Sequence, residues 1–253
     1  MPTTHIPTRE RERVPVSEYV LGSFVPISRL SHDWEMHSAV QLTPAEERMM
    51  VREPAQAVPE SAAHRLGKLR VLLVPHVACS ADGDLVCFSK PKGETHSSVW
   101  LEAADRTHLI LPCRELDAHD TGFEFLASIA ELLHPRLESH EIEQYSRLLE
   151  DELEAGLGGE IDEDAVVAKQ PLLKTRGVSR RGRSPFERYR DVSFVSTMAE
   201  YMHGLWHDVQ IRVGPEHLPL PQLRRRMKLL AEFFPPNEGY KVFAEELTET
   251  EDS

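Results

Sequence analysis

The residues best suited to chemistry lie in the stretch TMAEYMHGLWHDVQ, residues 197–210. On a helix, His203 and His207 are one turn apart, so their imidazoles could bind the same metal ion. Glu200 lies one turn earlier and could be a third ligand, or could orient His203 through its second ring nitrogen. A divalent ion held there would activate a water molecule and supply hydroxide near neutral pH. The spacing therefore predicts a divalent metal site on this helix.

Three further residues could complete that ligand set. Asp208 directly follows the second histidine, and His119 with Asp120 follows the segment that we expect to form a sheet. The Glu-x-x-His spacing adds little, because it recurs at Glu131 and His134 and chance accounts for both occurrences in a chain with this many glutamates and histidines. The hypothesis therefore depends on what surrounds the helix.

The helix face that carries the candidates is unusual for a surface in contact with water. It combines the two histidines and one glutamate with Ser193, Ser196 and Gly204, where a solvated face normally has long charged side chains. We expect this face to be covered by protein, with solvent exposure and a metal or catalytic site as the alternatives. The opposite side is a broad apolar face made of Phe194, Val195, Met198, Tyr201, Met202, Leu205, Trp206 and Val209.

Four helices are expected after residue 117. For the third of them, Ser184 is the predicted N-cap and Pro185 the first helical residue. Thr121 and Glu124 predict a capping box at the start of the first. The predicted helices cover residues 121–134, 138–155, 185–208 and 220–234.

A charged loop is predicted at 157–183, between the second and third helices. Its basic half includes Arg180, Arg181 and Arg183, which could bind an anion or an acidic partner. The alternative is that these arginines pair with the acidic run from Glu138 to Asp164 of the same chain.

Residues 68–113 have the pattern of a small antiparallel β-meander of about four strands. Short runs rich in apolar and β-branched residues alternate with turn residues, and Asp82-Gly83 is typical of a two-residue hairpin turn. Residues 1–65 are rich in proline and predict an extended, partly disordered N-terminal arm. A short helix is expected within this arm, with Thr43 as N-cap and Pro44 and Glu46 in its first turn. The fold class is therefore α+β, with a single domain over 66–249.

The three cysteines give a weaker indication of chemistry. His76, Cys79 and Cys87 have spacings compatible with zinc binding. A two-residue turn at Asp82-Gly83 would, however, place the two cysteines on opposite faces of the hairpin, which favours buried apolar cysteines. Cys113 could act as a nucleophile only if the fold brings a histidine such as His119 beside it.

Composition restricts the classes of function. The formal net charge of -13 over 253 residues argues against nucleic acid as a partner. No apolar run is long enough to cross a bilayer, and residues 1–20 lack the apolar core of a signal peptide, so the expected location is cytoplasmic.

Two classes of function remain. The first is a metal-dependent, hydrolytic enzyme with Glu200, His203 and His207 at its site. The second is a non-catalytic protein-interaction or assembly module that binds a partner through residues 1–65 and the basic loop at 174–190.

Overall fold

The computed structural model describes residues 12–174, 184–207, 214 and 216–243, and these form two units. The first unit contains residues 12–56 and 66–128, and the second contains 57–65 and the described residues from 129 to 243.

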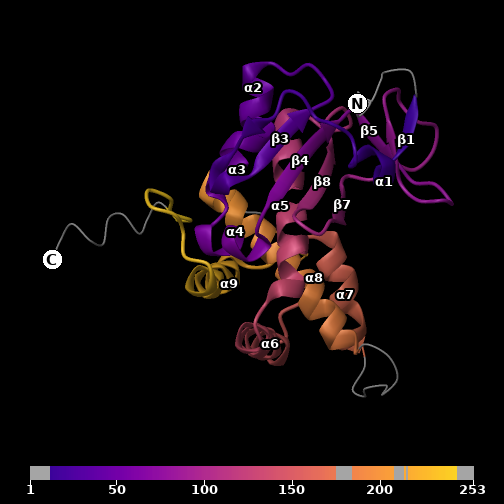
Figure 1. Cartoon of the computed structure of the whole chain (residues 1–253). Coiled ribbons are helices and arrows are strands. Elements are labelled where there is room, and N and C mark those ends of the chain that lie inside the picture. The colour runs from indigo at the N-terminus through magenta and orange to yellow at the C-terminus, as the bar shows by residue number, and fades with distance from the viewer. Residues whose placement is uncertain (1–11, 175–183, 208–213, 215, 244–253) are drawn as a thin grey trace. The chain divides into compact units, whose positions relative to one another are not determined.

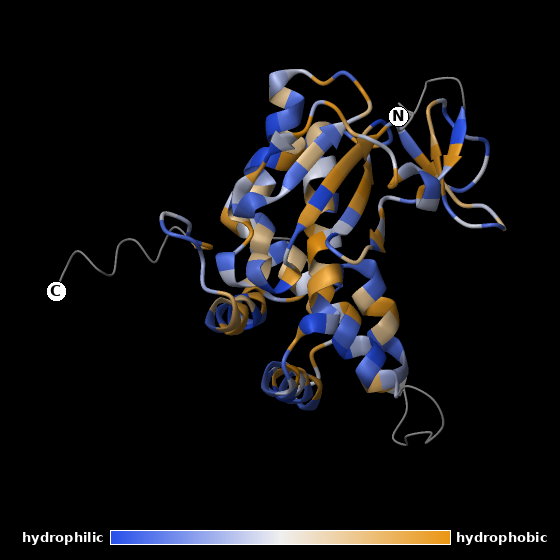
Figure 2. Cartoon of the chain, viewed as in Figure 1, coloured by the Kyte–Doolittle hydropathy of each residue, from blue (hydrophilic) through white to orange (hydrophobic). Residues whose placement is uncertain are grey.

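A five-stranded mixed sheet is the centre of the first unit (Figure 1). Its strand order is β2-β3-β4-β8-β7, in which β3, β4 and β8 are parallel and the two edge strands are antiparallel to their neighbours. The central strands β4 and β8 are buried along nearly their whole length and strongly apolar (Figure 2). The strands are β2 (Ser28–Arg29), β3 (Glu35–Ser38), β4 (Leu69–Val74), β7 (Val99–Glu102) and β8 (Thr107–Pro112).

A second, three-stranded antiparallel sheet has the order β1-β6-β5. Its strands are β1 (Arg13–Pro15), β5 (His76–Ala78) and β6 (Leu85–Cys87). Val77 and Val86 are paired across β5 and β6, and both are fully buried in the apolar core of this unit. The remaining elements of the first unit are α1 (Val16–Tyr19), η1 (Ser31–Asp33), α2 (Pro44–Glu47), η2 (Arg48–Arg52) and α3 (Glu53–Ala57), followed by α5 (Ala118–Leu133) up to Ser128.

The described part of residues 1–65 is folded, so the predicted extended arm is wrong for residues 12–65. This segment contributes β1, β2 and β3, and Trp34 and Val51 are fully buried. The capping box of Thr43 with Glu46 is present as predicted. Pro15 ends β1 and Pro44 is the first residue of α2, positions where proline is tolerated, so these prolines do not indicate a disordered chain.

The predicted meander is also wrong in its pairing. The runs LRVLLV and THLILP lie side by side as the parallel strands β4 and β8, while the segments between them form β5, β6 and β7. Near-continuous apolar runs are typical of parallel strands covered on both faces, whereas half-exposed meander strands alternate. The β5–β6 hairpin is closed by a longer loop than expected, since Ala78 pairs with Leu85, and Gly83 is the loop residue with positive φ.

The second unit is built from helices. Of the four predicted helices, all form within a few residues of the expected bounds, as α5, α6, α8 and α9. Ser184 is the N-cap of α8 with Pro185 as the first helical residue, as predicted, and Ser184 also forms a capping box with Glu187. The start of α5 is one turn earlier than predicted, because Asp117 and not Thr121 accepts a hydrogen bond from the first turn. The helices of this unit are α4 (Glu60–Leu66), η3 (His134–Arg136), α6 (Ser139–Glu154), α7 (Glu163–Lys174), α8 (Pro185–Trp206) and α9 (Leu220–Phe233).

Helix α7 occupies residues 163–174 of the loop predicted at 157–183, so that prediction is wrong for these residues. The Asp162 carboxylate accepts a hydrogen bond from the backbone N–H of Ala165, and Glu163 and Asp164 occupy the first turn, where acidic residues are favourable. α7 packs along α8 (Figure 1). The fold is therefore mixed α and β, as expected, with an arrangement that differs from a meander followed by helices. Across the described residues, no helix is long and apolar enough to span a membrane.

Candidate functional site

The predicted metal ligands lie at the C-terminal end of α8. The His203 Nδ1 is 3.9 Å from a carboxylate oxygen of Glu200, and the ring centroids of His203 and His207 are 5.9 Å apart at 72°. His203 is 5% exposed, and its ring also contacts Trp206. Glu200 and His203 are therefore one turn apart on α8, whereas His207 is the C-cap residue with extended backbone, and the structure encloses His203 in protein.

The other predicted site residues belong to the first unit or lie outside the described residues. His119 and Asp120 lie at the start of α5 in the first unit, with His119 Nδ1 3.4 Å from Asp120 Oδ1. Asp208 lies outside the described residues, as do Arg180, Arg181 and Arg183. Among the described residues, no group of three or more His, Cys, Asp or Glu side chains is arranged to hold a metal ion. The metal site stays a prediction.

The small-residue face of α8 is covered by neighbouring helices. The Tyr145 hydroxyl of α6 lies 3.0 Å from the backbone oxygen of Ser193 and 2.8 Å from the Thr197 hydroxyl. The Ser196 hydroxyl donates a hydrogen bond to Asp162 at 2.5 Å. Ser193 and Thr197 are fully buried. The serines of this face therefore allow close packing and form hydrogen bonds to neighbouring elements. This agrees with the expectation that the face is covered by protein.

A fully buried ionic cluster joins four helical elements next to this face. Arg226 of α9 contacts Glu152 of α6 at 2.5 Å and Glu160 of the α6–α7 loop at 2.8 Å. Lys169 of α7 contacts Glu160 at 2.8 Å, and the Tyr189 hydroxyl of α8 donates to the same carboxylate. Two cations and two carboxylates leave the cluster with no net charge, which is the arrangement that makes burial of charge tolerable.

The electrostatics of the cluster favour its charged form. Burial alone would raise the pKa of Glu160, but the hydrogen bonds and positive charge of Arg226 and Lys169 outweigh it and lower the pKa to about 2. Burial raises the pKa of Tyr189, and the charge of Glu160 raises it further. The side chains of Arg226, Glu160 and Lys169 have no solvent-exposed surface, so a substrate could not reach them. The cluster is suited to holding α6, α7, α8 and α9 together.

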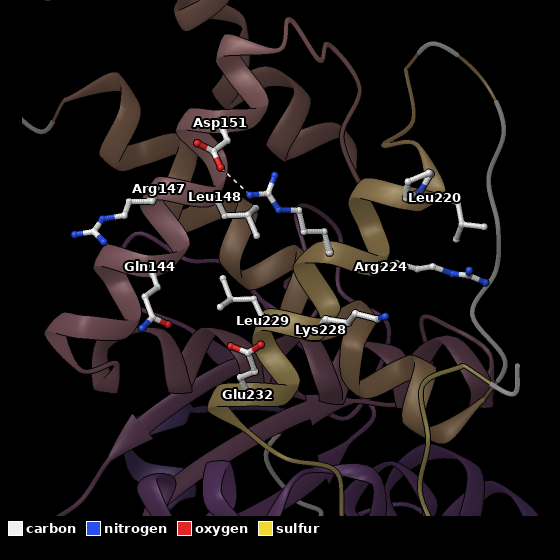
Figure 3. A pocket seen from close by; sticks show the side chains of 11 residues that line it. Gln144, Arg147, Leu148, Asp151, Leu220, Arg224, Lys228, Leu229 and Glu232 are labelled. Atoms are coloured by element: carbon white, nitrogen blue, oxygen red, sulfur yellow. Dashed lines mark hydrogen bonds and ion pairs between the residues drawn. The ribbon is translucent and has the colours of Figure 1, made fainter. Parts of the chain in front are cut away.

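An open groove between α6 and α9 is the candidate functional surface of the second unit (Figure 3). Its volume is about 830 Å³. Leu148 of α6 and Leu229 of α9 extend toward one another across its floor, and the Asp151–Arg225 ion pair at 2.7 Å bridges the two helices. The groove is lined by Gln144, Arg147, Leu148, Asp151, Leu220, Pro221, Arg224, Arg225, Lys228, Leu229 and Glu232.

The groove is more basic than the chain that carries it. Its lining has four basic residues and two acidic ones, an excess of two positive charges, whereas the whole chain has a formal charge of -13. The Arg225–Asp151 pair is more than half exposed on both sides, and Arg147 pairs with Glu143 in an equally exposed position. Exposed ion pairs of this kind are weak, so these arginines can exchange their partners for the carboxylates of a ligand.

No protein-family model matches this sequence, and neither a curated protein nor a solved structure resembles it significantly. The function therefore has to be inferred from the geometry of this molecule.

Sequence reasoning missed both the buried cluster and the groove. For the cluster a signal exists: Arg226 is three residues after Leu223 and four before Leu230, so helical periodicity puts it on the buried face. For the groove, the run RRRMK of α9 was a signal of a basic surface. This run lines a groove only because α6 lies beside α9, and the sequence does not specify that the two helices are neighbours.

Proposed function

We propose that the protein is a non-catalytic interaction module that binds an acidic, amphipathic helix of a partner protein in the α6–α9 groove. The groove between two helices, with leucines on its floor and an excess of positive charge around it, is the observation that carries this proposal. An amphipathic helix fits such a surface by placing its apolar face between the two helices. Its acidic residues would then meet Arg147, Arg225 and Lys228.

Charge supports an acidic partner over a basic one. The protein as a whole repels acidic molecules, so a local basic surface is the place where one can approach. Binding of this kind should weaken with salt, because the groups involved are exposed to solvent.

A second exposed apolar surface supports the same class of function. In the segment between α1 and β2, Leu21 is 85% exposed and Val25 is 83% exposed, while Phe24 of this segment and Tyr19 at the end of α1 are buried. The partner contact expected within residues 1–65 has its best candidates in these two side chains. Their exposure makes these two side chains candidates for contact with a partner.

The metal-dependent hydrolase has weaker support than the interaction module. Glu200 and His203 are 3.9 Å apart, but both side chains are largely shielded from solvent, so a substrate has little access to an ion between them. Elemental analysis of protein purified without a histidine tag tests this hypothesis directly. One equivalent of zinc, iron or manganese that is lost in His203→Phe protein would favour it over the proposal made here.

Site-specific photo-crosslinking tests the interaction. A photoreactive amino acid at Leu229, in the groove, is expected to capture a discrete partner through an acidic peptide in the cells that make the protein. The same amino acid at Leu173 serves as a matched control, because Leu173 is a partly exposed leucine on α7. The double change Arg225→Glu and Lys228→Glu should abolish the crosslink at Leu229. Identical crosslinking from both positions, or a crosslink indifferent to the charge reversal, would refute the proposed groove.

A further inference from the structure

The second sheet of the first unit brings three reactive side chains together. Cys79 directly follows β5, Asp84 directly precedes β6, and His96 lies in the segment that leads to β7. The Cys79 Sγ is 3.0 Å from His96 Nε2, and Asp84 Oδ1 is 2.9 Å from the same nitrogen. Neither the proposed groove nor α8 uses any of these residues.

The backbone register explains why these side chains meet. Ala78 pairs with Leu85 on one side and with Thr95 on the other. Cys79 therefore lies opposite Asp84, while the backbone N–H of His96 donates to the carbonyl of Val77. Residues opposite one another, or two apart along one strand, point to the same face of a sheet. The cluster is thus a consequence of strand pairing and does not depend on long, mobile side chains.

The hydrogen bond to Asp84 indicates which ring nitrogen of His96 carries a hydrogen. An ionised carboxylate can only accept, so His96 Nε2 must carry a hydrogen to bond with Asp84. The Cys79 sulfur, 3.0 Å from that nitrogen, therefore faces a donor. A donor beside the sulfur can hydrogen-bond to the thiolate, which is the nucleophilic form of cysteine. Because the sulfur and the carboxylate share one N–H, the arrangement is that of a hydrogen-bonded nucleophile.

The two other cysteines lack these properties. Cys113 is buried, its thiol donates to the Val74 carbonyl, and burial raises its pKa to about 11. Cys87 is fully buried in β6. Cys79 is exposed, and the His96 and Asp84 side chains are each more than one third exposed. A reagent in solution can therefore reach Cys79 while the other two thiols are protected.

We propose that Cys79 is a reactive thiol that undergoes thiol–disulfide exchange with low-molecular-weight disulfides. The Cys79 thiolate attacks one sulfur of the disulfide, a new S–S bond forms, and the original S–S bond breaks. The second sulfur leaves as a thiolate with the electron pair of the broken bond and takes a proton from solvent. The disulfide is the oxidant, and its released half is the reduced product. Because Cys87 and Cys113 are buried, the reaction stops at a mixed disulfide.

Oxidised glutathione is the probe that tests this site. Reduced full-length protein is incubated with it at pH 7, the remaining thiols are blocked with N-ethylmaleimide, and each cysteine is followed by peptide mass spectrometry. Cys79 should form the mixed disulfide about tenfold faster than a free peptide with the sequence of residues 75–84. His96→Phe should reduce the rate at Cys79 to that of the peptide, and Asp84→Asn should give an intermediate rate.

The protection of Cys87 shows whether each variant keeps its fold. Because Cys87 lies in the same small sheet, it should stay inaccessible to N-ethylmaleimide without denaturant in both variants. If His96→Phe exposes Cys87, Asp84→Asn becomes the deciding variant. A rate at Cys79 equal to that of the peptide would overturn the proposal. The proposal would also be overturned if folded His96→Phe or Asp84→Asn protein formed the mixed disulfide at Cys79 as fast as the native protein.

Discussion

Two ion pairs join the same two helices through adjacent residues, and they differ in how far their side chains are exposed to solvent. Asp151 of α6 pairs with Arg225 of α9 at 2.7 Å, with more than half of each side chain exposed. One residue further along each helix, Glu152 pairs with Arg226 at 2.5 Å, and both are buried. A step of one residue turns a helical side chain by about 100°, which is enough to move it from the groove to the interior.

The buried pair stabilises the fold, whereas the exposed pair is available to bind a ligand. The buried pair has lost its water and is part of a network with Glu160 and Lys169, so removing one member leaves a charge that nothing solvates. The exposed pair keeps its water and contributes little to stability. Only the exposed pair is free to respond to a ligand, and it lines the groove that we propose as the binding surface.

The largest effect is expected when Arg226 is replaced by methionine. Glu152 and Glu160 would then be buried with Lys169 as their remaining cation, and the free energy of unfolding should fall by about 3–5 kcal/mol. Urea unfolding measured by circular dichroism gives this value. Arg225→Met is the matched control and should change the stability by less than about 1 kcal/mol. Equal losses in both variants would show that the two pairs are energetically alike.

The second largest effect is expected from acid, which should weaken the buried ionic cluster. The pKa of Glu160 is about 2 in the folded protein and 4.5 in its reference state, so its contribution is present above pH 4.5 and is lost as the pH falls toward 2. That shift corresponds to about 3 kcal/mol at neutral pH. Urea midpoints between pH 7 and pH 3 should therefore decrease more steeply for the native protein than for Glu160→Gln. Parallel pH curves would contradict the assigned role of this carboxylate.

A smaller decrease in the free energy of unfolding is expected from Tyr145→Phe. The Tyr145 hydroxyl is buried and bonds to Ser193 and Thr197 on α8, and its removal leaves one or more of these groups with a weaker partner. The expected cost is about 1–2 kcal/mol. The shift in urea midpoint measures it, with Tyr240→Phe as a control at a residue that is largely outside the core. No loss would mean that α8 is held by packing and the ionic cluster alone.

The smallest effect is expected for the coupling between Asp151 and Arg225. A double-mutant cycle with Asp151→Asn and Arg225→Gln should give an interaction energy of about 0–1 kcal/mol, which decreases further with added salt. The four urea unfolding curves of the cycle provide the measurement. A coupling above about 2 kcal/mol would make this pair a structural element and would weaken the case for a responsive groove.

The elements whose signals are local could be predicted well. Ser184 with Glu187 and Thr43 with Glu46 form the capping boxes that start two helices, and each depends on residues within one turn. Helices α6, α8 and α9 have nearly the expected bounds for the same reason. The start of α7 at Glu163 was missed because the charged sequence around it resembles a loop, although its hydrogen bond to the preceding Asp162 is equally local.

The pairing of strands could not be predicted in the same way. The apolar runs of β4 and β8 are evident in the sequence, but they are 38 residues apart at their first residues, Leu69 and Thr107. Nothing in the runs themselves specifies that they pair in parallel, or that β3 from the proline-rich segment joins them. The two-residue turn expected at Asp82-Gly83 gave the wrong register for β5 and β6, and hence misjudged the surroundings of Cys79.

The sequence by itself determined that α8 has one large apolar face and one face of small and titratable residues, because side-chain positions on a helix follow from a fixed rotation per residue. It also determined that the small-residue face was unsuited to open solvent. Only the tertiary structure decided what covers that face: Tyr145, Asp162 and the cluster around Arg226. The physical reason is that helical periodicity is local, whereas burial depends on which distant segments pack together.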